Sequence, residues 1–313
     1  MDAKYMLAFT DADDAPYALA ASPEFARDGI CFAACGSGLY RSQNGGERWE
    51  LLRTSSESVT TAVAVSPAFE QDRSVFAAVK GGVLRSSDGG ETWFTTPFAA
   101  PPPLFSSLIA SPNFERDGFL LASTLEDGVF SSSDRGLRWQ PWNFGLFDLN
   151  VLCLALSPAW IDDETVYAGT ETGLYRSTNG GRAWRHTGFP AEFPPVLCMT
   201  CIDDRRNGVT RILVGTEGHG MLASWDWGEA WERVATDLIS GAVNQLHVRP
   251  YDAGGLVVFA LAEDGILYSD DAGRSWTKAM HTTETPTAML PLADGILLGV
   301  QGRGVQRLSS LCS

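Results

Sequence analysis

The stretch Ser86-Ser87-Asp88-Gly89-Gly90-Glu91-Thr92-Trp93 decides the fold, because its pattern returns along the whole chain. The pattern is Ser-x-Asp/Asn-x-Gly-x-x-Trp. The other five copies end at Trp49, Trp139, Trp184, Trp231 and Trp276. Successive Asp or Asn residues of the six copies lie 44, 46, 45, 47 and 45 residues apart. A motif that repeats at a nearly constant spacing predicts a repeat architecture, in which neighbouring units share one core.

The chemistry of the motif is that of a tight turn. A short Asp or Asn side chain accepts hydrogen bonds from the backbone N–H groups that follow it, and glycine adopts backbone angles that other residues resist. Each copy stands between two strand-like runs, such as residues 38–41 and 49–52 around the first copy. The motif therefore predicts a β-hairpin turn over which the Trp ring folds back.

The second repeat shows how many strands a unit contains. Residues 61–65, 74–79, 83–85 and 93–96 are strand-like, and a Ser-Pro loop, a glycine pair and the motif separate them. Four antiparallel strands in a repeat of about 45 residues are typical of one blade of a β-propeller. The same pattern predicts six blades at residues 17–53, 60–97, 104–142, 150–188, 195–235 and 243–280.

The two ends of the chain suggest a seventh blade. Residues 286–309 contain three more strand-like runs but no seventh motif and no fourth strand. A lone apolar run, residues 5–9 from Tyr5 to Phe9, precedes the first blade. Because an exposed strand edge is a pairing hazard, we expect this run to be the outer strand of blade seven. The alternative, six blades with loose ends, leaves two apolar segments without backbone partners.

The prediction is thus an all-β chain that forms one domain over residues 1–313. That domain is a seven-bladed β-propeller of four-stranded antiparallel blades, and the N-terminal strand closes its ring.

The repeated motif resembles the Asp-box of the BNR-repeat proteins, and the resemblance covers nearly the whole chain. That superfamily includes sialidases, xyloglucan-degrading endoglucanases, sortilin-type receptors and photosystem II assembly factors. The resemblance implies a β-propeller in which the Asp-box joins the third and fourth strands of a blade, away from the ligand face. It also implies that the motif serves folding and not catalysis.

The chain departs from the enzymes of this superfamily. Sialidases bind their substrate with three channel arginines, whereas Arg41, Arg85 and Arg176 stand beside the Asp-box, and no Arg-Ile-Pro segment occurs near the start. The endoglucanases pair two propellers, and this chain has one. The single-ring assembly factors are most similar in architecture, which implies a binding role. Their partner surface is rich in Arg, however, and this chain is acidic.

Charge and composition exclude some functions. With 23 basic and 38 acidic residues the net charge is −15, which argues against a nucleic-acid partner and favours a cationic one. The first six residues lack the pattern of a secretory signal. The longest uncharged run, residues 95–114, holds five prolines, which is typical of a connector and not of a membrane span. We expect a cytoplasmic monomer with buried thiols, unless a leader has been removed.

Four up-and-down strands per blade define two faces. The Ser-Pro loops and the Asp-boxes belong to one face, and the second-to-third-strand turns and the interblade connectors belong to the other. By analogy between folds, function is expected on the second face. The turns of blades three to six carry Glu126, Asp127, Glu171, Glu217, His219, Glu263 and Asp264 there. This acidic rim suits a cation, a basic peptide or acid–base chemistry; the alternative is solvated turn residues on an acidic protein.

Three connectors on the same face are rich in aromatic residues. Those after blades two, three and four carry the candidate binding residues Phe98, Trp142, Phe144, Phe147, Phe189 and Phe193. Apolar side chains on a loop-rich face often mark a contact surface. The alternative is that they fold inward and cover the channel or the edges of blades.

Two cysteine pairs and one histidine are weaker candidates for a site. Cys198-x-x-Cys201 lies in a predicted strand, where residues three apart point to opposite faces, so we expect no metal or other cofactor there. Cys153 and Cys198 occupy equivalent positions in neighbouring blades and fit core thiols. His247, with Gln245 on the same side of its strand, fits a hydrogen-bonded structural histidine facing the channel.

The sequence therefore predicts a non-enzymatic binding or assembly scaffold with a protein or small-molecule partner. The alternative is an enzyme acting on a glycan or another small molecule. Its candidate carboxylates are Glu126, Glu171, Glu217 and Glu263, with His219 or His247. Paired carboxyl groups about 5–5.5 Å or about 6.5–9.5 Å apart would favour that alternative. A metal-binding carboxylate rim is the third possibility.

Overall fold

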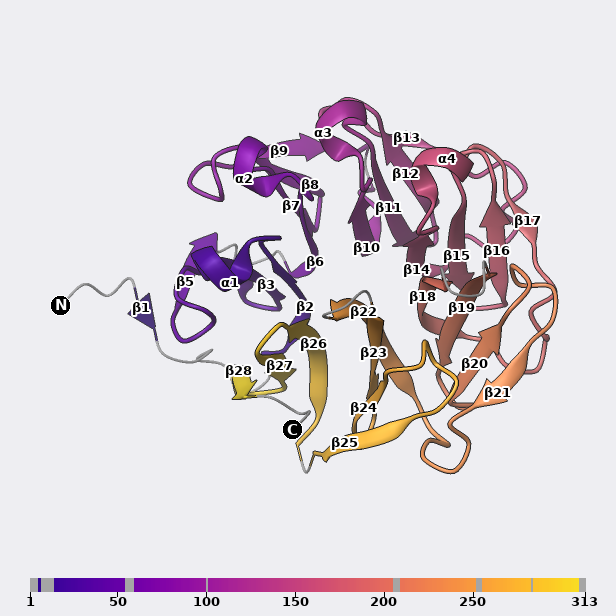
Figure 1. Ribbon diagram of the computed structural model, residues 1–313. Helices are drawn as coiled ribbons and strands as arrows, with labels where there is room; N and C mark the ends of the chain where they lie inside the picture. The colour runs from indigo at the N-terminus through magenta and orange to yellow at the C-terminus, as the bar shows by residue number, and fades with distance from the viewer. Residues whose placement is uncertain are drawn as a thin grey trace.

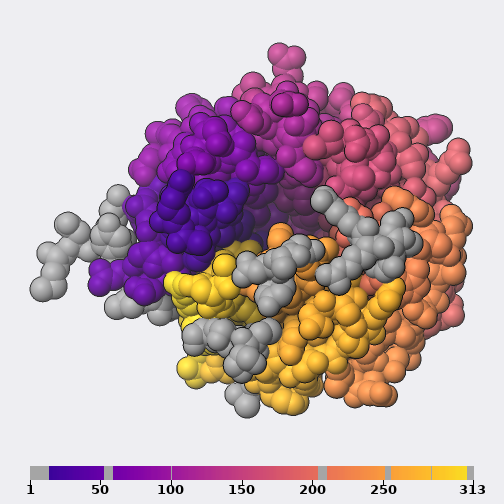
Figure 2. All heavy atoms as spheres, in the orientation of Figure 1, coloured from indigo at the N-terminus to yellow at the C-terminus, as the bar shows by residue number. Residues whose placement is uncertain are grey.

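Seven antiparallel β-sheets stand around a common axis (Figure 1). The computed structural model describes residues 5–6, 14–53, 59–99, 101–204, 209–251, 255–282 and 284–309. The sheets follow one another round the ring in chain order, and Figure 2 shows the molecule hollowed at the centre of the ring. The predicted seven-bladed propeller is confirmed.

The first four blades share one plan, in which a single helical turn joins the first two strands. Blade one contains β2 (Pro16–Ala21), α1 (Phe25–Asp28), β3 (Cys31–Cys35), β4 (Gly38–Ser42) and β5 (Trp49–Arg53). Blade two contains β6 (Thr60–Val65), α2 (Phe69–Asp72), β7 (Val75–Val79), β8 (Gly82–Ser86) and β9 (Phe94–Pro97). Blade three contains β10 (Leu104–Ala110), α3 (Phe114–Asp117), β11 (Leu120–Leu125), β12 (Gly128–Ser132) and β13 (Gln140–Pro141). Blade four contains β14 (Val151–Leu156), α4 (Trp160–Asp163), β15 (Val166–Thr170), β16 (Leu174–Ser177) and β17 (Arg185–His186).

The last three blades lack the helical turn in the part that the structure describes. Blade five contains β18 (Val196–Asp204), β19 (Val209–Thr216), β20 (Met221–Ser224) and β21 (Glu232–Val234). Blade six contains β22 (Val243–Tyr251), β23 (Gly255–Ala262), β24 (Gly265–Ser269) and β25 (Thr277–His281). Blade seven contains β26 (Pro286–Leu292), β27 (Gly295–Val300) and β28 (Gly304–Ser309). None of the described helices is long and apolar enough to cross a bilayer.

The six copies of the repeated motif, called Asp-boxes below because of the resemblance, form the predicted turns. In blade two, Ser86 Oγ accepts the N–H of Gly90 at 2.8 Å and donates to Asp88 Oδ1 at 2.7 Å. The Asp88 carboxylate in turn accepts the N–H of Thr92 at 2.9 Å. The Trp93 indole N–H donates to the Gly90 carbonyl at 3.0 Å. The motif thus satisfies its own backbone groups, which stabilises the turn.

The Ser-Pro loops and the Asp-boxes meet on one face, as predicted. In blade two, Ser66 Oγ donates to Asp72 across α2 at 2.7 Å, and Arg73 closes the helical turn in the left-handed conformation. The Arg73 carbonyl then accepts the N–H of Gly89 in the Asp-box at 2.9 Å. Blades one, three and four repeat this last hydrogen bond. The second-to-third-strand turns lie on the opposite face, together with the ends of the connectors.

The closure of the ring differs from the prediction. Strand β1 (Tyr5–Met6) pairs antiparallel with β5 of blade one, with Tyr5 opposite Glu50 and Met6 opposite Trp49. Figure 1 shows β1 at the outer edge of that blade. The expectation that residues 5–9 complete blade seven is therefore corrected for Tyr5 and Met6, and residues 7–9 lie outside the described ranges. In the sheets of the described residues no strand lies beside the outer edge of β28, and the outer edge of β5 offers backbone N–H and C=O groups of the same kind, so it can accept the short strand.

Side chains close the ring instead. The innermost strands β2 and β26 pack against each other, so that blade seven contacts blade one. The apolar cluster between these blades contains Leu19, Cys31, Ala33, Cys35, Trp49, Ala288, Leu292 and Leu297. Arg307 on β28 also donates to the Gly45 carbonyl of the first Asp-box at 3.1 Å. The seam between the first and last blades is thus a packed core of the kind that joins the other blades.

Candidate functional site

The predicted acidic rim is exposed, and its members lie on separate blades. Glu126, Glu171, Glu217 and Glu263 are all exposed, and each belongs to the turn of a different blade. Glu171 accepts a hydrogen bond from Asn150 Nδ2 at 3.1 Å. Within the described ranges, no group of three or more His, Cys, Asp and Glu side chains is placed to hold a metal ion. The rim therefore exposes carboxylates on four separate turns.

The two candidate histidines lie in different surroundings. His219 is half-buried, and its ring meets that of Phe193 edge to face at 5.4 Å between centroids. His247 on β22 lies 3.2 Å from Gln245 Oε1, which also accepts the N–H of Met289 in blade seven. Burial lowers the pKa of His247 to about 4, so its imidazole is neutral near pH 7. These contacts tie blade six to blade seven.

The thiols are core residues. Cys198 Sγ donates to the Val243 carbonyl of blade six, whereas Cys201 packs in the cluster on the blade-four side. The two side chains thus point to opposite faces of their blade, as predicted. Burial raises the pKa of Cys153 and of Cys201 to about 12, which keeps both thiols protonated.

The arginines beside the Asp-boxes join neighbouring blades. Arg41 is buried, and its Nη1 donates to the Gly89 carbonyl at 2.9 Å and to Glu91 Oε1 at 2.7 Å, both in the Asp-box of blade two. The Arg176 guanidinium stacks over the Trp227 ring of the blade-five Asp-box at 5.1 Å. These contacts occupy both arginines at the interfaces between blades.

Four of the six connector aromatics pack against neighbouring groups: Phe189 is buried, and Phe98, Trp142 and Phe193 are half-buried. Phe98 lies 6.1 Å from the Trp139 ring of the next blade's Asp-box, and Phe189 lies 5.0 Å from the Trp231 ring in the same way. Trp142 accepts the Trp184 indole N–H through its carbonyl oxygen at 2.7 Å. With Phe193 set against His219, these residues cover blade edges, which was the alternative interpretation of the connectors.

The other two aromatics are open to solvent. Phe144 is 81 % exposed and Phe147 is 89 % exposed, although both belong to the short connector between blades three and four. Between them, Leu146 is buried in the core shared by those blades. The connector therefore buries the Leu146 side chain in the core and exposes the Phe144 and Phe147 side chains to solvent.

Hydrogen bonds hold the start of this connector in place. Asn143 Oδ1 accepts the N–H of Val129 at 2.8 Å, and its Nδ2 donates to the Asp127 carbonyl at 2.9 Å. The Phe144 carbonyl accepts the N–H of Trp184 at 2.8 Å, which brings the connector to the outer strand of blade four. A Cβ on Gly145 would come within 2.2 Å of the Trp184 carbonyl oxygen, and the φ of Gly145 is +80°, so this position requires glycine.

An aspartate holds the end of the connector. Asp148 accepts the hydroxyl of Thr172 at 2.6 Å, the N–H of Thr172 at 2.9 Å and the N–H of Asn150 at 3.0 Å. Burial acts to raise the pKa of Asp148, but the hydrogen bonds from Thr172 and Asn150 outweigh it and hold the pKa below its ordinary value. The ionised carboxylate thus fastens the connector to the turn of blade four.

We call residues 142–150 together with the turns 126–128 and 171–173 the blade three–four platform. Sequence reasoning found its aromatic and acidic members but missed Gly145, Leu146 and Asp148, which hold it rigid. The signal available was the run Asn-Phe-Gly-Leu-Phe-Asp at residues 143–148, where Asn, Gly and Asp stand among apolar residues as they do in ordered turns.

Comparisons with known proteins bear on the fold. No family model matches the sequence, and no curated protein matches it. Among solved structures, an ancestral GH74 enzyme superposes with a TM-score of 0.75 at 18% identity, covering 99% of this chain and 46% of that one. The GH74 xyloglucanase from Xanthomonas campestris superposes with a TM-score of 0.75 at 18% identity, covering 98% of this chain and 53% of that one.

A second kind of neighbour is a single ring. YCF48 bound to D1 peptide superposes with a TM-score of 0.68 at 16% identity, covering 99% of this chain and 98% of that one. YCF48 from Cyanidioschyzon merolae superposes with a TM-score of 0.67 at 13% identity. The chain thus spans about half the length of the GH74 enzymes and nearly the full length of YCF48. At these identities the likeness concerns the fold, a seven-bladed propeller found both in enzymes and in peptide-binding proteins.

Proposed function

We propose that this protein is a non-enzymatic binding or assembly scaffold that holds a protein partner on the blade three–four platform. One observation carries the proposal: Phe144 and Phe147 are 81 % and 89 % exposed on a connector that is hydrogen-bonded to both adjoining blades. Large exposed apolar groups often mark interaction sites, and aromatic side chains dominate many interfaces. A loop that is already ordered loses little entropy when it binds.

The charge around the two phenylalanines indicates the kind of partner. Glu126, Asp127 and Glu171 are exposed on the turns that the connector contacts. A partner segment with an apolar anchor and nearby Lys or Arg would match this arrangement, and the net charge of −15 would steer it toward the surface. YCF48, a single ring of similar extent, binds a peptide, which supports a binding role for this architecture.

The test replaces the exposed aromatics. We expect Phe144→Ala with Phe147→Ala to remove a set of co-precipitated proteins from a lysate of the source organism, as measured by quantitative mass spectrometry. Both side chains are solvent-exposed, so the melting temperature should change little.

The matched control is Leu137→Ala with Ile161→Ala. These side chains are 57 % and 64 % exposed and belong to the Asp-box of blade three and to helix α4 of blade four, outside the platform residues. The control should retain the same proteins. If both double variants behave like the wild type, the platform is not the binding surface.

A second candidate is a glycan-active enzyme, which the similarity to the GH74 propellers favours. Its carboxylates would have to act from separate blades, since each candidate Glu lies on its own exposed turn. Incubation with xyloglucan, followed by a reducing-end assay, tests it directly. Release of reducing ends that Glu171→Gln abolishes would replace the scaffold proposal with an enzyme.

The proposal also places the protein in the cytoplasm as a monomer. The five cysteines in the described ranges are free thiols, which suits a reducing compartment. Sedimentation of the purified chain and fractionation of the source cells test these two points.

A further inference from the structure

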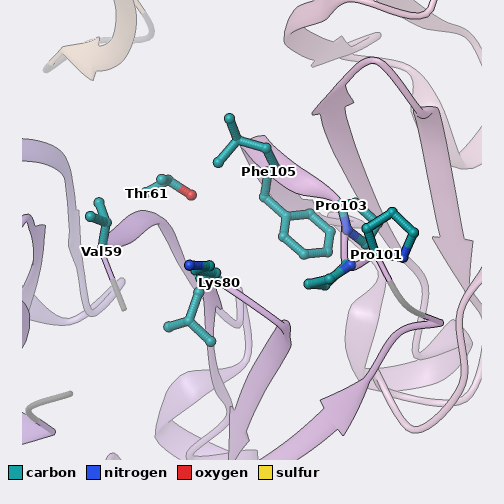
Figure 3. Close-up of a pocket in the computed structure, with 9 residues that line it drawn as sticks. Val59, Thr61, Lys80, Pro101, Pro103 and Phe105 are labelled. Carbon is teal, nitrogen blue, oxygen red and sulfur yellow. The ribbon is translucent and has the colours of Figure 1, made fainter. Parts of the chain in front are cut away.

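A cavity opens between blades two and three, apart from the residues of the platform. Its volume is about 410 Å³, and Figure 3 shows the side chains around it. The lining residues are Val59, Thr61, Val79, Lys80, Pro101, Pro102, Pro103, Leu104 and Phe105. Binding sites for small molecules have volumes of about 300–1,000 Å³, so the cavity falls in that class by size.

The walls are almost entirely apolar. Pro101, Pro102 and Pro103 form one wall, and beside it Leu104 is 53 % exposed at the start of β10. Three consecutive prolines present no backbone N–H group. An extended peptide bound along this wall would therefore leave its own carbonyl groups without partners, which disfavours strand addition as the binding mode.

The polar groups of the cavity are hydrogen-bond donors. Lys80 stands in the second-to-third-strand turn of blade two and forms no ion pair within the described ranges. The Thr61 hydroxyl is buried and has no hydrogen-bond partner among the described residues. Figure 3 shows Thr61 and Lys80 on one side of the cavity, opposite Phe105 and the proline wall. Because the Thr61 oxygen has no contact with solvent, Lys80 is the hydrogen-bond donor that a molecule in the cavity can reach.

We propose that this cavity binds a small amphiphilic carboxylate, a molecule with an apolar body and one carboxyl group. The apolar body contacts the prolines, Leu104 and Phe105. The carboxylate accepts hydrogen bonds from the Lys80 ammonium on the opposite side. This ligand site is independent of the platform and of the protein partner proposed for it.

Electrostatics oppose an anion at long range. The chain carries −15, and Glu126 and Asp127 occupy the corresponding turn of the neighbouring blade. Burial of the apolar body must therefore supply most of the affinity, while Lys80 selects the headgroup. The expected ligand preference is a carboxylate over an uncharged molecule with the same chain.

The experiment is calorimetric titration of the full chain with decanoate and, separately, with 1-decanol. We expect decanoate to bind more tightly than 1-decanol. Lys80→Met should weaken decanoate binding by about fivefold, the effect of one exposed ion pair, and leave 1-decanol binding unchanged. Thr61→Val, which keeps the shape and removes a hydroxyl that does not face the cavity, should bind decanoate like the wild type.

The chain offers a matched control for Lys80. Arg303 is the basic residue in the corresponding turn of blade seven, and Arg303→Met makes the same change in net charge at a distance from the cavity. This variant should bind decanoate like the wild type. The double variant at Phe144 and Phe147 should also retain decanoate binding, which separates failure of this proposal from failure of the scaffold proposal.

Three outcomes would overturn the proposal: no binding of decanoate at millimolar concentration, equal affinity for decanoate and 1-decanol, or equal losses in Lys80→Met and Arg303→Met. A decapeptide with a C-terminal leucine that binds more tightly than decanoate would assign the cavity to a protein terminus instead. Because Lys80 is exposed, its variant should fold, and a melting curve checks this.

Discussion

At the residue scale, two adjacent serines of blade three allow the stability contributed by a hydrogen-bonded hydroxyl to be compared with that of a hydroxyl without a partner. Ser132 Oγ accepts the N–H of Gly136 at 2.9 Å and donates to Asp134 Oδ1 at 2.9 Å. Its neighbour Ser131 is equally buried, but its hydroxyl has no partner among the described residues. We expect Ser132→Ala to lower the free energy of unfolding by about 1–3 kcal/mol. Ser131→Ala should leave it within about 0.5 kcal/mol or raise it.

Urea denaturation of both variants measures the difference. The two substitutions remove the same atom from neighbouring positions in one strand, so effects on strand propensity and side-chain volume are nearly matched. Equal losses of stability would show that the Asp-box hydrogen bonds contribute nothing specific to this turn.

The Asp-box carboxylates make stability depend on acid pH. Burial acts to raise the pKa of Asp88, but hydrogen bonds from Thr92, Ser86 and Glu91 outweigh it and lower the pKa to about 2. Since the folded pKa lies below the ordinary value, the ionised form stabilises the fold. That contribution is complete above about pH 4 and is lost as the pH falls toward 2.

Asp88→Asn tests this sign, because asparagine occupies the same position in two natural copies of the motif, at Asn44 and Asn179. The variant keeps an acceptor and cannot titrate. We expect the wild type to be the more stable at pH 6, and the difference to shrink toward zero near pH 2. A difference that stays constant across this range would contradict the hydrogen-bonded carboxylate.

At the scale of one element, the connector of the platform depends on a glycine. Alanine at position 145 would have to keep a φ of +80° and would place its Cβ 2.2 Å from the Trp184 carbonyl oxygen. We expect Gly145→Ala to cost about 1–3 kcal/mol of stability and to weaken partner binding although both phenylalanines remain. Gly218→Ala is the control, since a Cβ there meets nothing within 4 Å. Thermal melts and the co-precipitation assay measure the two effects.

The burial of the connector aromatics could not be predicted from the sequence. Composition alone placed Phe98, Phe144 and Phe189 in one class, because each follows a fourth strand in a Pro- or Gly-rich run. In the structure these three residues differ. The rings of Phe98 and Phe189 contact the Trp ring of the next Asp-box. The Phe144 carbonyl instead accepts the N–H of Trp184, and the Phe144 ring is exposed to solvent. Such a division depends on contacts between blades, which no local pattern encodes.

At the scale of the whole molecule, the repeat spacing predicts six blades and their two faces, and the three strand-like runs at residues 286–309 predict the seventh. Six Asp-boxes specify six third-to-fourth-strand turns, and each turn must share a face with the Ser-Pro loops of an up-and-down blade. The pairing of the terminal strand was not predictable in the same way. The outer edges of β5 and β28 are both available, and hydrophobic pattern does not choose between two equivalent edges.

The seam between blades one and seven provides the last test. In the structure, Tyr5 and Met6 pair with blade one, so removal of residues 1–9 leaves the side chains of the seam in place. We expect this deletion to change the free energy of unfolding by less than about 1 kcal/mol. Leu297→Ala should cost about 2–5 kcal/mol, because Leu297 is fully buried between the two blades. If a terminal strand were essential to close blade seven, the deletion would cost at least as much stability as Leu297→Ala. Denaturant unfolding of both variants shows which of the two loses more stability.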